Sequence, residues 1–285
     1  MLDYLVIGIF TGAAYGLLAV SFVLVYKGTR IFNLAQGEIG AFGLYFAWVL
    51  VESGVPVAVA ALAGVALAAL TGLTMERLLV RRLVDSTPLA ALAATLGAGL
   101  TLAYIESIVW GWNIKTFPSP IGTWRWEVGS LTITSTRVAA LVVAAIVASG
   151  LVVFLRRTRF GLSVQAATSD QVLARLSGVK VDQVRSFVWA LGGALAGVAA
   201  ILLAAVLTFH PLSTTLILVR ALTAAMLGGL TSLPGAFVGG LVIGVAESVV
   251  ISQTGVGGMV DLVIFMIMLG VLILRPGGIF GAQEA

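Results

Sequence analysis

Segments of apolar residues long enough to cross a lipid bilayer recur along almost the whole chain. A helix needs roughly 20 such residues to cross about 30 Å of hydrocarbon. Hydrophobic residues make up 60% of the 285 positions and charged residues only 10%, against about 25% charged in an ordinary soluble domain. We therefore expect the bilayer to be the solvent of this chain. The candidate membrane segments are residues 4–26, 36–51, 56–75, 89–110, 137–155, 186–208, 214–230, 236–252 and 258–274.

These segments are rich in Ala, Leu, Val and Gly and lack the alternation of a barrel strand. The pattern predicts an all-α fold, a polytopic transmembrane bundle of eight or nine helices that forms a single domain over residues 1–285. Eight helices would span if one segment is re-entrant. The first segment starts near Tyr4 and is too long for the apolar part of a signal peptide, so we expect it to be retained.

The charges indicate an orientation in the membrane and give no reason to expect a nucleic-acid partner. The net charge is +4, and the cations lie in short loops, where the positive-inside rule places them in the cytoplasm. Only Lys115, Arg125 and Arg137 fall on the opposite side, so we expect the N-terminus outside and the C-terminus inside. The cations on the predicted cytoplasmic side are Lys27, Arg30, Arg77, Arg81, Arg82, Arg156, Arg157, Arg159, Arg175, Lys180, Arg185 and Arg275.

Residues 111–136 form the one sizeable loop on the predicted outer side. β-prone stretches surround Gly129, and tryptophans lie in or beside the loop. We expect either an external hairpin lid or a belt of aromatic side chains at the membrane interface, and the pattern favours the belt. The tryptophans are Trp110, Trp112, Trp124 and Trp126.

Two polar clusters interrupt the apolar pattern just before a membrane segment. They are residues 33–38, Asn-Leu-Ala-Gln-Gly-Glu, and residues 228–235, Gly-Gly-Leu-Thr-Ser-Leu-Pro-Gly. The tripeptide Gly-Ala-Phe follows or ends each cluster, at 40–42 and 235–237, and precedes Glu52 and Glu247 by the same distance. This match indicates an internal repeat with broken or re-entrant helices, because unwound backbone at membrane depth is tolerated only where it faces protein or water.

Four blocks resemble the permeases of branched-chain amino-acid ABC transporters, a family that includes urea and short-amide permeases. Residues 33–38 are similar to the family's Asn-Phe-Ala-His-Gly-Glu, although Gln36 stands where many members have His. The loop 111–136 does not align, but the blocks cover both ends and the middle of the chain. They are residues 26–43, 157–193, 220–247 and 275–281.

The resemblance implies a transport subunit, and not an enzyme, in a bacterial-type inner membrane. It would pair with a second related permease or a copy of itself, two cytoplasmic ATPases and an external solute-binding protein. It would move branched-chain amino acids or similar small polar solutes by alternating access. The chain lacks a G-x-x-x-x-G-K-[ST] loop, so the partner subunits would use the ATP. We expect no cofactor on this chain, and no metal, because no cluster of His, Cys and carboxylate ligands occurs.

The predicted cytoplasmic loop, residues 156–185, is the candidate contact with the ATPase. Residues 163–178 predict one short helix capped near Gly178, and the resemblance implies a coupling helix that inserts apolar side chains, Leu173 and Leu176 among them, into the ATPase. From the residues alone, an amphipathic loop whose arginines anchor the topology is the simpler explanation. The candidate coupling residues are Gly161, Gln165, Ala166, Asp170, Ala174, Arg175 and Gly178.

Polar residues within or beside the segments are candidates for the translocation pathway, because a charge inside a bilayer is costly. Arg220 would snorkel to the interface, pair with an acid or contact a substrate carboxylate. Glu247 would pair structurally or face a wet cavity, and Glu38 would cap a helix or line the pathway. The candidates are Asn33, Gln36, Glu38, Arg220, Thr231, Ser232 and Glu247; Glu106 also lies within a segment.

A gradient-driven secondary transporter or channel is the main alternative, because broken apolar helices fit it equally well. Such proteins often carry relays of acids inside the membrane, and this chain has few candidates. An intramembrane enzyme has little support. One loop histidine, His210, no cysteine and no Gly-x-Ser-x-Gly turn leave few groups for nucleophilic catalysis.

Overall fold

The computed structural model describes residues 2–83, 86–119, 124–128, 131–211, 213–275 and 277–281. The first half contains α1 (Leu2–Thr29), α2 (Gln36–Glu52), α3 (Val57–Leu78), the 3-10 helix η1 (Val80–Leu83) and α4 (Pro88–Trp110). A hairpin and the middle helices follow: β1 (Arg125–Val128), β2 (Leu131–Thr134), α5 (Ser135–Arg157), α6 (Arg159–Ser169) and α7 (Gln171–Leu176). The last four are α8 (Val181–Ala204), α9 (Ser213–Gly228), α10 (Leu233–Thr254) and α11 (Gly257–Leu274).

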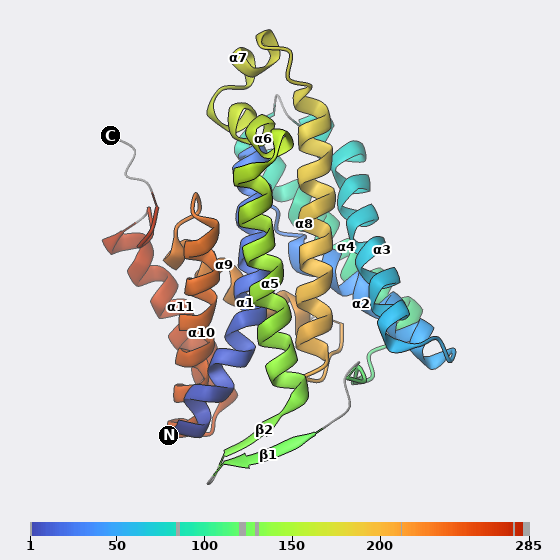
Figure 1. Cartoon of the computed structure of the whole chain (residues 1–285), viewed down its shortest axis with the longest axis vertical. Helices are drawn as coiled ribbons and strands as arrows, with labels where there is room; N and C mark the ends of the chain where they lie inside the picture. The colour runs from blue at the N-terminus through green and yellow to red at the C-terminus, as the bar shows by residue number, and fades with distance from the viewer. Residues whose placement is uncertain are drawn as a thin grey trace.

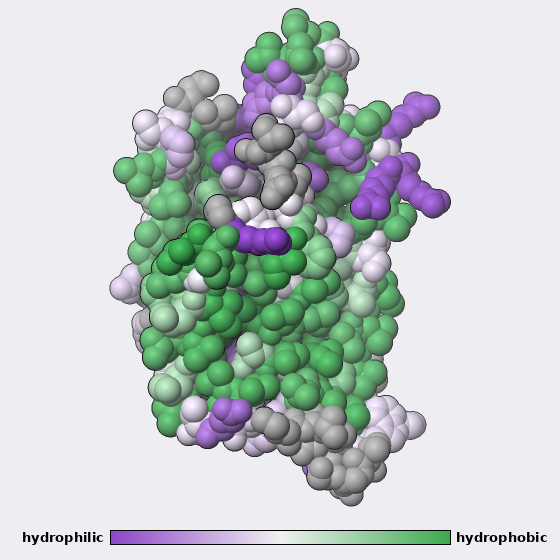
Figure 2. Space-filling model, turned by 90° about the vertical axis from the view of Figure 1, so that its left-hand side faces the viewer, coloured by the Kyte–Doolittle hydropathy of each residue, from purple (hydrophilic) through white to green (hydrophobic). Residues whose placement is uncertain are grey.

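Each predicted membrane segment overlaps one of these helices, although the segments 186–208 and 214–230 extend past the ends of α8 and α9; the all-α polytopic fold is confirmed. Among the described residues, six helices, α1, α3, α4, α5, α8 and α10, are long and apolar enough to cross a membrane, whereas the apolar parts of α9 and α11 are shorter. Figure 2 shows a broad hydrophobic belt between hydrophilic patches at the two ends of the molecule. That distribution is the one expected of a bundle surrounded by lipid.

The bundle has two distinct ends (Figure 1). One carries α6 and α7 and is called the α6–α7 end here; the other carries the β1–β2 hairpin and is called the hairpin end. The basic loops meet at the α6–α7 end, where Arg30 and Arg185 line one hollow and Lys27 and Arg156 line another. The predicted alternation of the cation-bearing loops onto one side is therefore present in the structure.

Helices α1–α4 and α8–α11 form two halves with the same packing and opposite directions. Helix α1 packs most extensively on α10 and α8 on α3, while α2 packs on α3 as α9 packs on α10. Helix α1 runs toward the α6–α7 end and α8 runs away from it (Figure 1). The packing therefore makes α2 equivalent to α9. The Gly-Ala-Phe match would pair α2 with α10, which are not equivalent helices, so that alignment of the two halves was wrong.

Glycines allow the closest helix pair, α1 and α10, to touch backbone to backbone. A Cβ on Gly240 would overlap the backbone of Gly16, and a Cβ on Gly244 would overlap that of Gly12. The equivalent pair, α3 and α8, is similar, since a Cβ on Gly193 would overlap the carbonyl of Ala68. Close contact of small residues drives helix association in lipid, where burial of apolar surface does not.

The described part of the loop 111–136 contains the predicted hairpin; residues 120–123, 129 and 130 lie outside the described residues. Strands β1 and β2 pair antiparallel, with Arg125 opposite Thr134. Trp112, Trp124 and Trp126 are exposed, as an interfacial belt requires. Trp110 instead stacks on Tyr45 with ring centroids 5.1 Å apart, so it belongs to the packing of α2 against α4.

Candidate functional site

The segment between α5 and α8 forms two helices, so the prediction of one helix over 163–178 was wrong. Asp170 ends α6 with an extended backbone and caps α7 with its carboxylate. Its Oδ1 accepts hydrogen bonds from the backbone N–H groups of Val172 at 2.7 Å and Leu173 at 3.0 Å. An aspartate in this position starts a new helix because it satisfies N–H groups that the first turn leaves unpaired.

Several predicted coupling residues serve the folding of this segment itself. A Cβ on Gly161 would overlap the backbone of Leu155, where α6 turns back on α5. The Nε2 of Gln165 donates to the Leu155 carbonyl at 3.1 Å. Ala174 is buried, Ala166 is half-buried, and Gly178, with a φ of +83°, lies just past the end of α7, near the predicted helix end. These positions shape the loop, and most of their polar groups are already used.

The side chains of the loop that remain exposed include several large apolar ones. Leu162 on α6 and Val172, Leu173 and Leu176 on α7 are 60–79% exposed; these four residues are called the loop patch here. Figure 1 shows α7 as the outermost element at the α6–α7 end. Exposed apolar patches of this kind are typical of surfaces that bind a protein, a membrane or a ligand. The sequence did not point to Leu162 and Val172, because it does not show which apolar residues of the loop are exposed.

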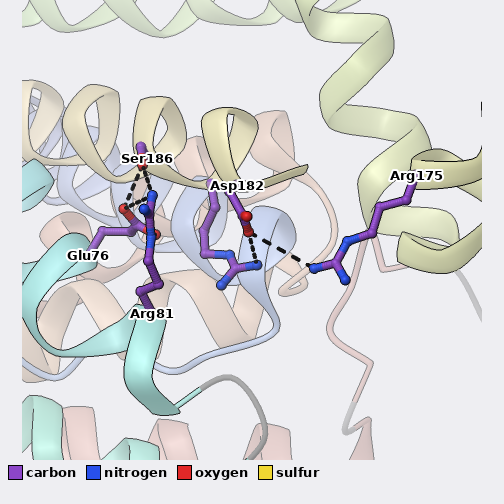
Figure 3. Close-up of polar contacts among 6 residues, drawn as sticks. Glu76, Arg81, Arg175, Asp182 and Ser186 are labelled. Carbon is purple, nitrogen blue, oxygen red and sulfur yellow. Dashed lines mark hydrogen bonds and ion pairs between the residues drawn. The ribbon is translucent and has the colours of Figure 1, made fainter. Parts of the chain in front are cut away.

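A buried carboxylate anchors the base of the loop to the bundle (Figure 3). Ser186 on α8 donates to Oε2 of Glu76 on α3 at 2.6 Å, and Nη2 of Arg81 donates to the Ser186 hydroxyl at 3.0 Å. The Arg81 Nε also lies 3.5 Å from Oε1 of Glu76, which is fully buried. The contacts tie the first turns of α8 to α3 and η1.

A second ion cluster lies beside the first in Figure 3 and joins α7 to α8. Asp182 Oδ1 accepts from Arg185 Nη2 at 3.1 Å and lies 4.0 Å from Nη2 of Arg175. Arg175 and Asp182 are both more than half exposed, so we assign this pair little stability. It is an ion pair between α7 and α8.

The first polar cluster closes the break before α2. Asn33 Nδ2 donates to Oε1 of Gln36 at 2.7 Å, and the Gln36 Nε2 donates to the Gly192 carbonyl of α8 at 2.9 Å and to the Ser21 hydroxyl of α1 at 3.2 Å. Asn33 and Gln36 are buried. The amides of these two residues thus fix the start of α2 between α1 and α8.

Glu38 joins the start of α2 to the start of α9. Its two carboxylate oxygens accept from Thr214 Oγ1 at 2.8 Å and Thr215 Oγ1 at 2.7 Å. The chain enters α2 from the α6–α7 end and α9 from the hairpin end, where Phe209 pairs with Lys115. Two half-helix starts from opposite ends therefore meet inside the bundle, an arrangement typical of transport sites. A small space of about 20 Å³ beside Thr214 leaves room for little more than one water.

Arg220 pairs with two acids, which is one of the alternatives expected for it. Its Nε lies 3.4 Å from Oε1 of Glu247 on α10, and its Nη2 donates to Oδ1 of Asp261 on α11 at 2.9 Å. Arg220 and Glu247 are only 13% and 15% exposed, while Asp261 is 50% exposed. The charges link α9, α10 and α11 in the second half of the bundle.

Comparison with known proteins identifies the family of the chain. The family described as "Branched-chain amino acid transport system / permease component" matches residues 4–272, nearly the whole chain. The chain belongs to this permease family. It is therefore a multi-pass inner membrane protein and the permease component of an ABC-type transport system, and such subunits are not enzymes.

Named relatives of this permease align with nearly all of the chain. The "High-affinity branched-chain amino acid transport system permease protein LivH" of Salmonella typhimurium is 30% identical over 97% of this chain and 94% of its own. BraD of Pseudomonas aeruginosa, described in the same words, is 30% identical over 99% and 96%. The probable LivH of Methanocaldococcus jannaschii is 31% identical over 94% and 88%.

Two of the blocks that resemble the family, residues 220–247 and 275–281, lie against each other in the permease. Gly229, with a φ of +97°, packs on the segment 277–281, and the N–H of Ile279 donates to the Leu227 carbonyl at 2.8 Å. Ser232 caps α10, accepting from the Gly235 N–H at 3.1 Å, and Thr231 lies beside it. Thr231 and Ser232 thus sit at the α6–α7 end, far from the helix starts at Glu38. Pro276 of the last block lies outside the described residues.

Glu106 of α4 is the polar group least explained by the packing. Its side chain is fully buried, and neither carboxylate oxygen has a hydrogen-bond partner among the described residues. The sequence placed an acid within a membrane segment but gave no sign of its surroundings. Lys115 was also assigned no role, although it lies over the Trp48 ring at 4.8 Å and is buried.

Proposed function

We propose that this permease forms one half of the pore of an ABC importer that moves branched-chain amino acids or similar small polar solutes by alternating access. The other half would be a second related permease or a copy of this chain. Two cytoplasmic ATPases and an external solute-binding protein would complete the assembly. This chain would bind no cofactor, because the ATP is used by the partners. The named relatives, which are branched-chain amino acid permeases, support the substrate class.

The proposed orientation places the α6–α7 end in the cytoplasm. That end carries the basic loops, and the positive-inside rule favours this arrangement. The N-terminus would lie outside and the C-terminus inside. The loop patch then faces the compartment that holds ATP.

The loop patch is the observation that carries the proposal. An ATPase that docks on Leu173 and Leu176 would push on α7, which the pair between Arg175 and Asp182 links to α8. Movement of α8 would reach the start of α2 through Gln36, which is bonded to Gly192 of α8. The hydrogen bonds from Thr214 and Thr215 to Glu38 would transmit this movement from α2 to the start of α9. One continuous set of contacts therefore leads from the docking surface to the meeting point of the half-helices.

Co-purification with the ATPase tests the docking step. Tagged wild-type chain in mild detergent should retain the ATPase subunits, and the Leu173→Asp, Leu176→Asp double variant should lose at least about tenfold of them, because two charges would enter an apolar contact. The matched control is Gln183→Asp, which adds a charge at an exposed position on the first turn of α8. Equal retention by the wild type and the double variant would reject the loop patch as the docking surface.

A further inference from the structure

A basic hollow opens at the α6–α7 end, separate from the meeting point of the half-helices. Its volume is about 530 Å³, and it is lined by the ends of α1 and α5, by α6 and by the loop between α9 and α10. In Figure 1 these elements come together below α6. The polar lining residues are Lys27, Arg156, Gln165, Thr231 and Ser232.

The charge of the hollow has one sign. Lys27 and Arg156 both line it, and none of the lining residues is an acid. Neither cation lies within 4.0 Å of an acidic oxygen among the residues that the structure describes. The start of α10, whose cap Ser232 belongs to the lining, adds the positive end of a helix dipole. Two unneutralised cations and a helix start favour an anionic occupant.

The remaining wall of the hollow is apolar, and this feature narrows the choice of anion. Leu24, Val152, Leu155 and Leu233 line it, and the Phe280 ring at its edge is 55% exposed. A free inorganic anion gains nothing from contact with an apolar wall, whereas a phospholipid carries acyl chains, next to its phosphate, that can pack against it. Basic hollows between membrane helices on the cytoplasmic side are typical sites for anionic lipid headgroups.

The depth of the hollow agrees with a headgroup. Lys27 lies in the last turn of α1 and Arg156 in the last turn of α5. Helix ends lie at the level of the lipid headgroups, whereas transported solutes bind near the midplane. We propose that the hollow binds the phosphate of an anionic phospholipid of the leaflet at the α6–α7 end. The assignment of that leaflet to the cytoplasm rests on the proposed orientation, but the binding itself does not.

Lipid binding by the purified full-length chain tests the proposal without any partner protein. The chain in detergent is titrated with phosphatidylglycerol or phosphatidylcholine, and bound lipid is counted by native mass spectrometry. We expect a preference of about tenfold or more for phosphatidylglycerol, to which each cation contributes. The Lys27→Gln, Arg156→Gln double variant should lose this preference. The matched control, Arg77→Gln with Arg82→Gln, removes two exposed cations at the same end and should keep it.

Two further arms keep the outcome decisive. Arg156→Gln alone changes an exposed side chain, so it should fold normally and still lose part of the preference. Glycerol 1-phosphate added at the same concentration should not displace the lipid; displacement would assign the hollow to a soluble phosphate and overturn the proposal. An equal loss of the phosphatidylglycerol preference in the double variant and its matched control would also overturn the proposal. The preference would then come from the general positive charge of this end and not from the hollow. Failure of the importer proposal would leave the binding result unchanged.

Discussion

The loop between α5 and α8 and the paired starts of α2 and α9 use their side chains in opposite ways. In the loop, Asp170 and Gln165 bond to the backbone of the loop itself, and the large apolar residues of the loop patch remain exposed. At the helix starts, Gln36 and Glu38 are buried, and each is hydrogen-bonded to residues of neighbouring helices. In these two regions polar side chains therefore hold the structure together, and we propose that the exposed apolar side chains of the loop patch contact a partner. The predictions below test this division.

Removal of the Arg220 charge should have the largest effect on stability. Arg220→Met leaves Glu247 without its cation, and the free energy of unfolding should fall by about 3–5 kcal/mol. Asp261→Asn removes the half-exposed partner and should cost about 1 kcal/mol or less. Both values are measured by denaturant unfolding in detergent. A loss in Arg220→Met no larger than in Asp261→Asn would mean that the Glu247 pair does not stabilise the bundle.

Loss of the Gln36 amide should come next. Gln36→Leu leaves the Asn33 amide and the Gly192 carbonyl without partners, which predicts a loss of about 2–4 kcal/mol in the same unfolding experiment. The control is Gln183→Leu, at an exposed site on α8, which should stay within about 0.5 kcal/mol. If Gln36→Leu behaves like its control, the helix start is not held by this amide and a pathway role for Gln36 becomes the better explanation.

Loss of the anchor at the base of the loop should lower the stability of the chain and leave its binding to the ATPase unchanged. Ser186→Ala removes the 2.6 Å bond to the buried Glu76 and should cost about 1.5–3 kcal/mol. The ATPase should still be retained in pull-downs, because the loop patch is intact. Ser186→Thr keeps a hydroxyl and should restore stability in part. Loss of ATPase retention in a folded Ser186→Ala chain would show that docking and anchoring are not separate.

Neighbouring positions on α7 provide the smallest expected effect. Leu173→Asp changes a side chain that is 60% exposed and should alter the free energy of unfolding by less than about 0.5 kcal/mol. Ala174→Asp would bury a carboxylate and should destabilise the loop by at least about 2 kcal/mol. Proteolysis of the loop and thermal unfolding measure both changes. Equal effects at the two positions would contradict the division between exposed and buried faces of α7.

The sequence predicted the helices well, because length and apolar composition alone decide whether a segment is a membrane helix. It did not predict that α2 and α9 begin inside the bundle, since this depends on how far the chain folds back before each helix. The repeat was expected, but a shared tripeptide paired α2 with α10. Only the packing of α1 on α10 and of α8 on α3 reveals the equivalent helices.

The candidate site was predicted in part. The loop 156–185 was located, yet the break at Asp170 was missed, although an aspartate that follows Ser169 is a signal for a helix start. The sequence could not choose a partner for Arg220, because Glu247 and Asp261 lie on other helices and only the packing brings them within reach. Nor could it separate Leu173, which is exposed, from Ala174, which is buried.

Solute uptake by the reconstituted importer tests the central claim most directly. Proteoliposomes that contain this permease with its partner subunits are loaded with ATP on the side of the α6–α7 end, and entry of labelled leucine is followed with ATP or with a non-hydrolysable analogue. The account predicts uptake that requires ATP hydrolysis and is lost in the Leu173→Asp, Leu176→Asp variant. Uptake by the permease alone, driven by an ion gradient and unaffected by these substitutions, would contradict it.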